Sequence, residues 1–129
     1  MSRVVHFEIH AADPQAAADF YAAVFGWTIE RWGDIEYWTV TTGPEGAPGI
    51  NGGILPRRGP AIEPGAPING SVVTVQIESL ADTLAAAFAH GATQALPRMP
   101  IPGIGWLAYI LDIDHNVVGV MEPDPTATA

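Results

Sequence analysis

The feature of this sequence that most restricts its fold is an order of secondary-structure signals that occurs twice. In each half, an alternating strand pattern is followed by a helical pattern and then by three short segments of strand-forming composition. A unit with one helix and one sheet leaves one sheet face bare unless two such units pair. The sequence therefore predicts two βαβββ modules, joined by a linker rich in Pro and Gly at residues 56–69.

The first module, about residues 3–55, opens with a strand whose side chains alternate in character. Because successive strand side chains point to opposite faces, the segment VVHFEIH at residues 4–10 has one apolar and one polar face. The two faces hold, respectively, Val5, Phe7 and Ile9, and His6, Glu8 and His10. This pattern is typical either of a half-solvated strand or of a polar site for a metal or substrate.

The helix of the first module is predicted from its two ends. Asp13 followed by Pro14 fits an N-cap and a first helical residue, and Gly26 fits a helix stop. We therefore expect a helix over about residues 14–25. Strands are expected after it at residues 27–32, 36–42 and 49–55.

The second module, about residues 70–122, repeats this order. Ser79 with Asp82 three residues later has the form of a capping box, and Gly91 suits a helix end, which predicts a helix over about residues 80–90. The other expected elements are strands at residues 71–78, 93–96, 105–111 and 116–121, with residues 99–103 as a strand connection.

Composition limits the classes of partner. The chain of 129 residues carries five basic and fourteen acidic residues, so it cannot assemble the Lys/Arg surface that nucleic acid or an anionic membrane requires. Without cysteine it has neither disulfides nor thiolate metal ligands, and no long apolar span suggests membrane insertion. We expect a cytoplasmic protein with a single domain over residues 3–124 and a flexible tail at 125–129.

Several strings, taken in order, resemble the vicinal oxygen chelate superfamily, which includes glyoxalase I, bleomycin-resistance proteins and extradiol dioxygenases. They are VVHFEIHAADPQAAADFYAAVFGW, GINGGI, HGA at residues 90–92 and PRMPIPGIGWLAYILDIDHNVVGVMEPD. The resemblance covers roughly residues 3–122 and is greatest to the branch related to lactoylglutathione lyase. It implies an α+β fold in which a curved eight-stranded, open barrel-like sheet forms a cup, with the helices outside.

In metal-using members of this superfamily, the ligands come from the first and fourth strands of each module. Carried over, these positions fall on His6, Val72, Gly119 and the region of Asn51. A divalent site normally draws three or more protein ligands, so the resemblance implies an incomplete metal site, and no cofactor is expected. A divalent metal held by His6 with Glu8, or by Glu8 with His10, stays open as an alternative.

The resemblance also places side chains of both modules around the cup. His6 and Glu8 are candidates for general acid–base catalysis. The expected ligand-binding residues are His6, Glu8, Trp38, Asn51, Thr74 and Trp106.

Three classes of function follow. The first is a protein that binds an aromatic or amphipathic small molecule, for which the net charge of −9 favours a cation. The second is a glyoxalase- or dioxygenase-type enzyme, a lyase or oxidoreductase, with an unusual metal site or a metal-free acid–base pocket. The third is a regulatory or interaction module without a small ligand. In each case we expect a homodimer, because the resemblance implies modules that pair within or between chains, and because exposed sheet edges and aromatic strands favour burial against a second copy.

Overall fold

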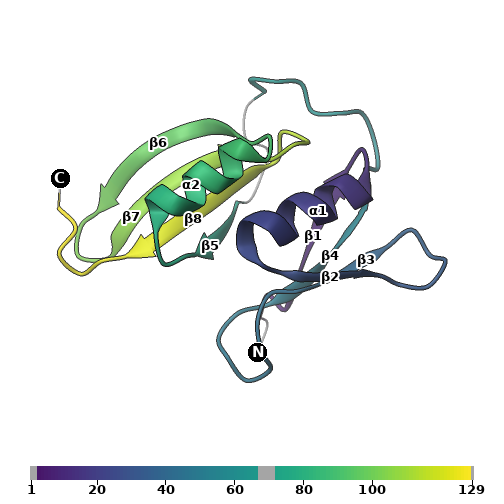
Figure 1. Ribbon diagram of the computed structural model, residues 1–129, viewed down its shortest axis with the longest axis horizontal. Coiled ribbons are helices and arrows are strands. Elements are labelled where there is room, and N and C mark those ends of the chain that lie inside the picture. The colour runs from purple at the N-terminus through teal and green to yellow at the C-terminus, as the bar shows by residue number, and fades with distance from the viewer. Residues whose placement is uncertain (1–2, 67–71, 129) are drawn as a thin grey trace. The chain divides into compact units, whose positions relative to one another are not determined.

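The computed structural model describes residues 3–66 and 72–128, and shows the predicted repeat (Figure 1). The described residues form two helices and eight strands, in the order β1, α1, β2, β3, β4, β5, α2, β6, β7, β8. The strands hydrogen-bond into two four-stranded sheets, β1-β4-β3-β2 and β5-β8-β7-β6, and not into one eight-stranded sheet. The predicted α+β class and the two βαβββ modules are confirmed, and the chain divides between Ala61 and Ile62 into two compact units.

The first unit contains one helix and four strands. Its elements are β1 (His6–Ala11), α1 (Pro14–Phe25), β2 (Thr28–Arg31), β3 (Trp38–Thr41) and β4 (Asn51–Pro56). β1 pairs with β4 in parallel, whereas β3 pairs antiparallel with both β4 and β2. The parallel pair places the first and last strands of the module side by side, so residues about 45 positions apart in the chain become neighbours, as His6 and Asn51 do.

Local signals fix the ends of α1 as the sequence predicts. The Asp13 side chain accepts a hydrogen bond from the Ala16 backbone N–H, and Pro14 begins the helix. Gly26 ends it with a φ of 72°, a left-handed conformation that glycine adopts without steric cost.

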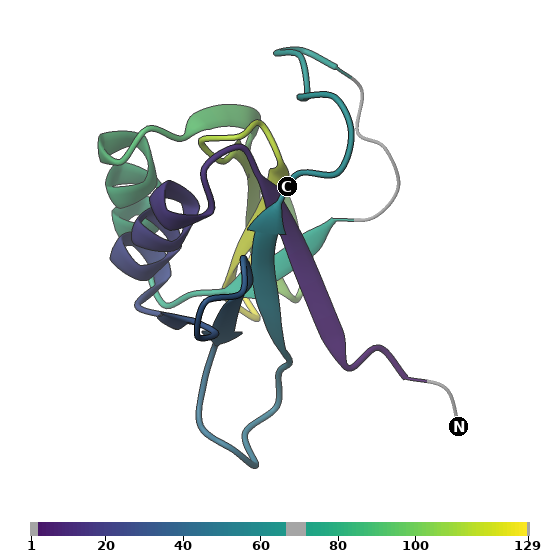
Figure 2. The same ribbon diagram turned by 90° about the vertical axis from the view of Figure 1, so that its right-hand side faces the viewer.

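The core of the first unit lies between α1 and one face of its sheet (Figure 2). The helix buries Phe20 and Tyr21, and the Tyr21 ring stacks on Trp27 with centroids 5.3 Å apart. The sheet contributes buried Val40 and Ile54 to the same core. Other members of this core are Ala17, Ala18 and Trp38, with Phe7 and Ile9 half-buried at the edge strand. Val5 precedes β1 and is 75% exposed, so the predicted apolar face of this strand packs only from Phe7 onward.

The second unit has the same composition of elements. They are β5 (Val73–Gln76), α2 (Leu80–Ala89), β6 (Thr93–Ile101), β7 (Gly105–Leu111) and β8 (Val117–Pro123). The Ser79 hydroxyl accepts a hydrogen bond from the Asp82 backbone N–H, as the capping signal predicts, and the first helical N–H, that of Leu80, donates to the Glu122 carboxylate at 2.8 Å. Leu80 and Ala87 are buried on α2, and Ala108, Ile110, Val118 and Val120 are buried on the sheet.

The prediction for β6 was too short. Pairing with β7 continues through Met99, Pro100 and Ile101, where the sequence suggested a connection, and it passes two register shifts on the way. β6 lies at the edge of its sheet, where a proline without an N–H does not interrupt the ladder. The prolines of this segment are therefore compatible with a strand.

The chain end is attached to the second unit where the sequence suggests a flexible tail. Ala127 is 2% exposed, its N–H donates to the carbonyl of Asp124, and its carbonyl accepts from the N–H of Gly103. In the described part of the chain, neither helix is long and apolar enough to cross a membrane.

The close pairing of β1 with β4 depends on Gly52. A Cβ at this position would overlap the carbonyl oxygen of Phe7, a backbone atom that cannot move without distorting the sheet. We expect Gly52→Ala to lower the free energy of unfolding by about 1–3 kcal/mol, as overpacking does. Urea unfolding measures it, with Gly43→Ala as control because a Cβ there meets nothing within 4 Å. Equal stability of the two variants would contradict this account of the strand pairing.

Candidate functional site

The face of the first sheet opposite α1 is polar. Register places His6 beside Asn51, and Glu8 beside Gly53, which in turn pairs with Thr39. These positions alternate along their strands with the residues that pack under α1, so they share the face opposite α1. Its described members are Thr28, Glu30, Thr39, Thr41, Asn51, His6 and Glu8, all exposed. His6 and Glu8 thus lie together, away from the packed face, as the alternation predicts.

Tyr37, which directly precedes β3, joins His6 and Glu8. Its hydroxyl donates to Glu8 Oε2 at 3.0 Å and lies 2.8 Å from His6 Nε2. His6 Nε2 and Glu8 Oε2 are 3.8 Å apart, and the two side chains are 49% and 42% exposed. These three residues form a hydrogen-bonded group that is open to solvent, the His6–Tyr37–Glu8 cluster.

Gly53 allows Tyr37 to reach β1. In the strand order β1-β4-β3, the Tyr37 side chain must cross β4 to meet residues of β1. It crosses at Gly53, because a Cβ on this residue would overlap the Tyr37 hydroxyl and ring. The Gly-rich string of β4 therefore has two functions: Gly52 admits the backbone of β1, and Gly53 admits the side chain of Tyr37.

The turn before Tyr37 is held by Arg31. Its guanidinium donates to the carbonyls of Ile35 at 3.1 Å and Asp34 at 3.4 Å, and its charge lies 5.0 Å from the Trp38 ring. The Trp32 N–H also donates to the Tyr37 carbonyl at 2.8 Å. These contacts fix the backbone from which the Tyr37 side chain projects.

The surroundings of Tyr37 keep its hydroxyl protonated. Burial, then the hydrogen bond to Glu8 and the negative charge of Glu8, raise the pKa of Tyr37 above its ordinary value. The phenol is therefore a hydrogen-bond donor at neutral pH, and not a phenolate base. Because the single phenolic proton goes to Glu8, the phenol oxygen accepts from His6, which places the His6 ring proton on Nε2.

Two of the positions that the resemblance assigns to metal ligands offer little to a metal ion. The Asn51 side-chain oxygen accepts from the Thr42 N–H at 2.9 Å, and Gly119 has no side chain to offer. Within residues 3–66 and 72–128, no three His, Asp or Glu side chains come together as a ligand set. His6 instead contacts Tyr37.

Trp38, expected beside His6 and Glu8, lies on the other face of the sheet. It is 6% exposed, and its Nε1–H donates to the Gln15 side chain of α1 at 3.0 Å. The sequence contains a signal for this placement, since Trp38 and Val40 alternate with Thr39 and Thr41. The same alternation puts Tyr37 on the polar side, a role that the sequence interpretation did not assign to it.

Thr74 and Trp106 belong to the second unit. Thr74 lies opposite Gly119, and a Cβ on that glycine would be 2.7 Å from the Thr74 hydroxyl. Trp106 donates from Nε1 to Asp124 at 3.1 Å, and the Arg98 guanidinium lies 3.9 Å from its ring centroid. A ligand contact for either residue stays a prediction.

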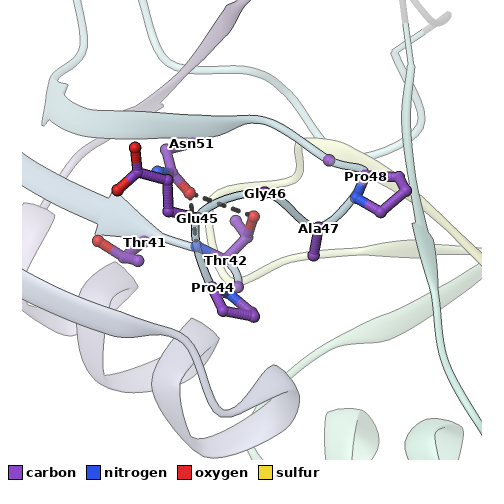
Figure 3. Close-up of a pocket in the computed structure, with 10 residues that line it drawn as sticks. Thr41, Thr42, Pro44, Glu45, Gly46, Ala47, Pro48 and Asn51 are labelled. Atoms are coloured by element: carbon purple, nitrogen blue, oxygen red, sulfur yellow. Dashed lines mark hydrogen bonds between the residues drawn. The ribbon is translucent and has the colours of Figure 1, made fainter.

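A hollow of about 560 Å³ lies in the β3–β4 loop of the first unit (Figure 3). Residues 41–49 and Asn51 line it. The Asn51 oxygen closes its neck by accepting from the N–H and hydroxyl of Thr42, and the Thr42 hydroxyl also donates to the Ile50 carbonyl at 2.7 Å. Asn51 is the strand neighbour of His6, so the hollow adjoins the polar face.

Comparisons with known proteins agree with this architecture. A family model described as bleomycin resistance protein-like N-terminal matches residues 3–43. A glyoxalase-related enzyme from Fulvimarina pelagi superposes with a TM-score of 0.71 at 16% identity, covering 100% of this chain and 99% of that one. The chain has the glyoxalase/bleomycin resistance fold. This confirms the fold that the resemblance to the vicinal oxygen chelate superfamily implies.

Two further structures share this fold. A fosfomycin resistance protein from Listeria monocytogenes gives a TM-score of 0.70 at 15% identity, covering 96% of this chain and 95% of that one. A glyoxalase/bleomycin resistance protein from Albidiferax ferrireducens gives 0.66 at 19% identity, covering 95% and 100%. No curated protein matches the sequence. The narrower branch related to lactoylglutathione lyase stays a prediction.

The raised pKa of Tyr37 can be measured directly. A raised pKa stabilises the fold below the unfolded value of about 10, and this stabilisation is lost as the pH rises through the folded value. The difference in absorbance at 295 nm between the native chain and Tyr37→Phe should give a midpoint above about 10. Glu8→Gln should lower that midpoint, while Glu63→Gln, an exposed residue of the second unit, should leave it unchanged. A midpoint that does not respond to Glu8→Gln would contradict the hydrogen bond.

Proposed function

We propose that this chain is a small-molecule-binding protein that holds a positively charged, amphipathic ligand on the polar face of its first sheet. The observation that carries this proposal is the solvent-open His6–Tyr37–Glu8 cluster, because it presents hydrogen-bonding groups without making them part of the core. Buried polar groups would serve the fold, whereas exposed and ordered ones are suited to binding.

The cluster offers acceptors to a ligand. Tyr37 occupies Oε2 of Glu8, and Oε1 has no partner within the described residues. In the tautomer that donates from Nε2 to Tyr37, His6 Nδ1 carries a lone pair. A carboxylate oxygen and an imidazole nitrogen, both acceptors, match an ammonium, guanidinium or other donor-rich group.

The charge of the surrounding face favours the same ligand. Glu8 and Glu30 both belong to the polar face, and none of its described strand residues is Lys or Arg. Arg31 is the basic residue of β2, and its side chain lies on the other face of the sheet, over the Trp38 ring. A negative surface of this kind raises the local concentration of cations and speeds their association.

The family model supports the proposal, because residues 3–43 include all three residues of the cluster. Its description names bleomycin resistance protein-like domains, and bleomycin is a basic glycopeptide, which makes it a suitable first probe.

A metal-free enzyme is a second candidate, and one specific observation favours it. The Tyr37 hydroxyl contacts both an imidazole and a carboxylate, an arrangement that can pass a proton between them. Mass spectrometry of a bound ligand after incubation separates the two functions: an unchanged ligand indicates binding alone, and a product that disappears with Glu8→Gln indicates catalysis.

Removing cluster groups should weaken binding. By isothermal titration calorimetry with bleomycin, Glu8→Gln and Tyr37→Phe should each raise Kd about tenfold, because a charge-assisted hydrogen bond is lost or misplaced. Gly53→Ala should have a similar effect by displacing Tyr37 while retaining every polar group.

The matched control is Glu63→Gln, which removes the same charge far from β1 in the sequence and outside any strand. Loss of affinity in this control as large as in Glu8→Gln would show a general charge effect. Should bleomycin not bind, a thermal-shift screen of cationic amphipathic compounds provides the ligand for the same variants. Affinities unaffected by all three cluster variants would overturn the proposal.

We also propose that the protein is a homodimer. The sheet orders leave β1, β2, β5 and β6 as edge strands among the described residues, and Val4 and Val5, just before β1, are 78% and 75% exposed. Unpaired edges and exposed apolar side chains favour pairing with a second copy. Light scattering after size exclusion should give twice the chain mass of 13.6 kDa. A monomer mass that does not change with concentration would contradict the dimer.

A further inference from the structure

The phenol of Tyr37 leans away from its own strand register. Continued by one residue, the pairing of β3 with β4 places Tyr37 opposite Leu55, whose neighbour on β1 is His10. The Tyr37 hydroxyl instead lies over Gly53 and donates to Glu8, which comes two residues before His10 on β1. The side chain therefore slants along the sheet, and strand pairing alone does not account for its direction.

The backbone that carries Tyr37 is an exposed turn. Residues 33–36, between Trp32 and Tyr37, are all exposed. The Trp32 N–H donates to the Tyr37 carbonyl at 2.8 Å, and the Ile35 N–H donates to the Trp32 carbonyl at 3.1 Å. Because exposed segments with few buried contacts open at a low cost in free energy, a turn of this kind needs a further restraint to hold a side chain in one direction.

Arg31 supplies that restraint. Its Nε donates to the carbonyl of Ile35 at 3.1 Å and a terminal nitrogen donates to the carbonyl of Asp34 at 3.4 Å, so one guanidinium spans two successive peptides of the turn. A planar fork of donors restrains both peptides together, whereas a lysine ammonium acts as a single point. Tyr37 follows these peptides after one residue, so a rotation of either would redirect its side chain.

Arg31 is itself anchored on the packed side of the sheet. Its guanidinium lies 5.0 Å from the centre of the Trp38 ring, and Trp38 is 6% exposed. The Trp38 Nε1–H in turn donates to the Gln15 side chain of α1 at 3.0 Å. The guanidinium thus connects the exposed turn to the core under α1, although the cluster lies on the other face.

We propose that Arg31 is a positioning residue for the His6–Tyr37–Glu8 cluster: it holds the turn at residues 33–36 so that the phenol lies over Gly53. Arg31 acts on a ligand through Tyr37 and not by contact, because its side chain lies on the opposite face of the sheet. Its effect on affinity rests on the proposed function, whereas its effect on the direction of Tyr37 does not.

The direction of the phenol can be followed by NMR without any ligand. One Hα of Gly53 points to where a Cβ would overlap the Tyr37 ring, so its chemical shift contains a ring-current contribution. The difference between the native chain and Tyr37→Leu measures that contribution. Arg31→Met keeps an unbranched side chain over Trp38 but loses the forked donor, and it should remove most of the contribution. Arg31→Lys, with the charge and a single donor group, should give an intermediate value.

Arg98→Met is the matched control for this measurement. The Arg98 guanidinium also lies over a tryptophan ring, 3.9 Å from the centroid of Trp106, but it belongs to the second unit. Its loss should leave the Gly53 signal as in the native chain, and urea unfolding shows that each variant is folded. Should Arg31→Met not fold, Arg31→Gln also lacks the fork and takes its place. A folded variant without the fork that keeps the native Gly53 shift would overturn the inference.

A double-mutant cycle with bleomycin tests whether Arg31 acts through Tyr37. Arg31→Met should raise Kd about fivefold in the native chain and have little further effect in the Tyr37→Phe chain. Loss of a positive charge by itself favours a cation, so Arg58→Met, an exposed charge control, should not raise Kd.

The outcomes of the cycle separate the two proposals. Equal losses of affinity from Arg31→Met in both backgrounds would overturn the action through Tyr37. An unchanged Kd in Arg31→Met, although the Gly53 ring-current contribution is lost, would count against the proposed function and support Arg31 as the residue that directs the phenol.

Discussion

Two consecutive glycines in β4 set the geometry of the first unit. Gly52 lets the carbonyl of Phe7 approach the backbone of β4, and Gly53 leaves room for the phenol of Tyr37 on the opposite face. Because strand side chains alternate, Gly52 lies on the packed face and Gly53 on the polar face. The parallel pairing of β1 with β4, and the cluster above it, both depend on the absence of these two side chains.

The two faces of this sheet have different functions in the molecule. The face under α1 buries Tyr21, Val40 and Ile54, and so supplies apolar burial, the main source of folding free energy. The opposite face can remain polar at little cost, because its groups are exposed or bonded to one another. The residues of such a face can change to suit a ligand without loss of the core. Proteins that share this fold include both an enzyme and a resistance protein.

Much of the fold could be predicted because its signals are local. The ends of α1 follow from Asp13, Pro14 and Gly26, and the repeated order of elements was sufficient to indicate two modules. The prediction failed for β6, where prolines suggested a connection, since a strand at a sheet edge tolerates them. Edge position is a property of the sheet and not of the segment.

The sequence by itself determined the alternation of β1, and hence that His6 and Glu8 share a face. Only the tertiary structure decided that Tyr37, 29 positions beyond Glu8, completes their group while Trp38 turns to the core. The reason is physical. Alternation shows that neighbouring side chains lie on opposite faces of the sheet, but it does not show which face packs against the helix. Nor does it state that β4 separates β1 from β3, so that a phenol must cross a glycine to reach a carboxylate.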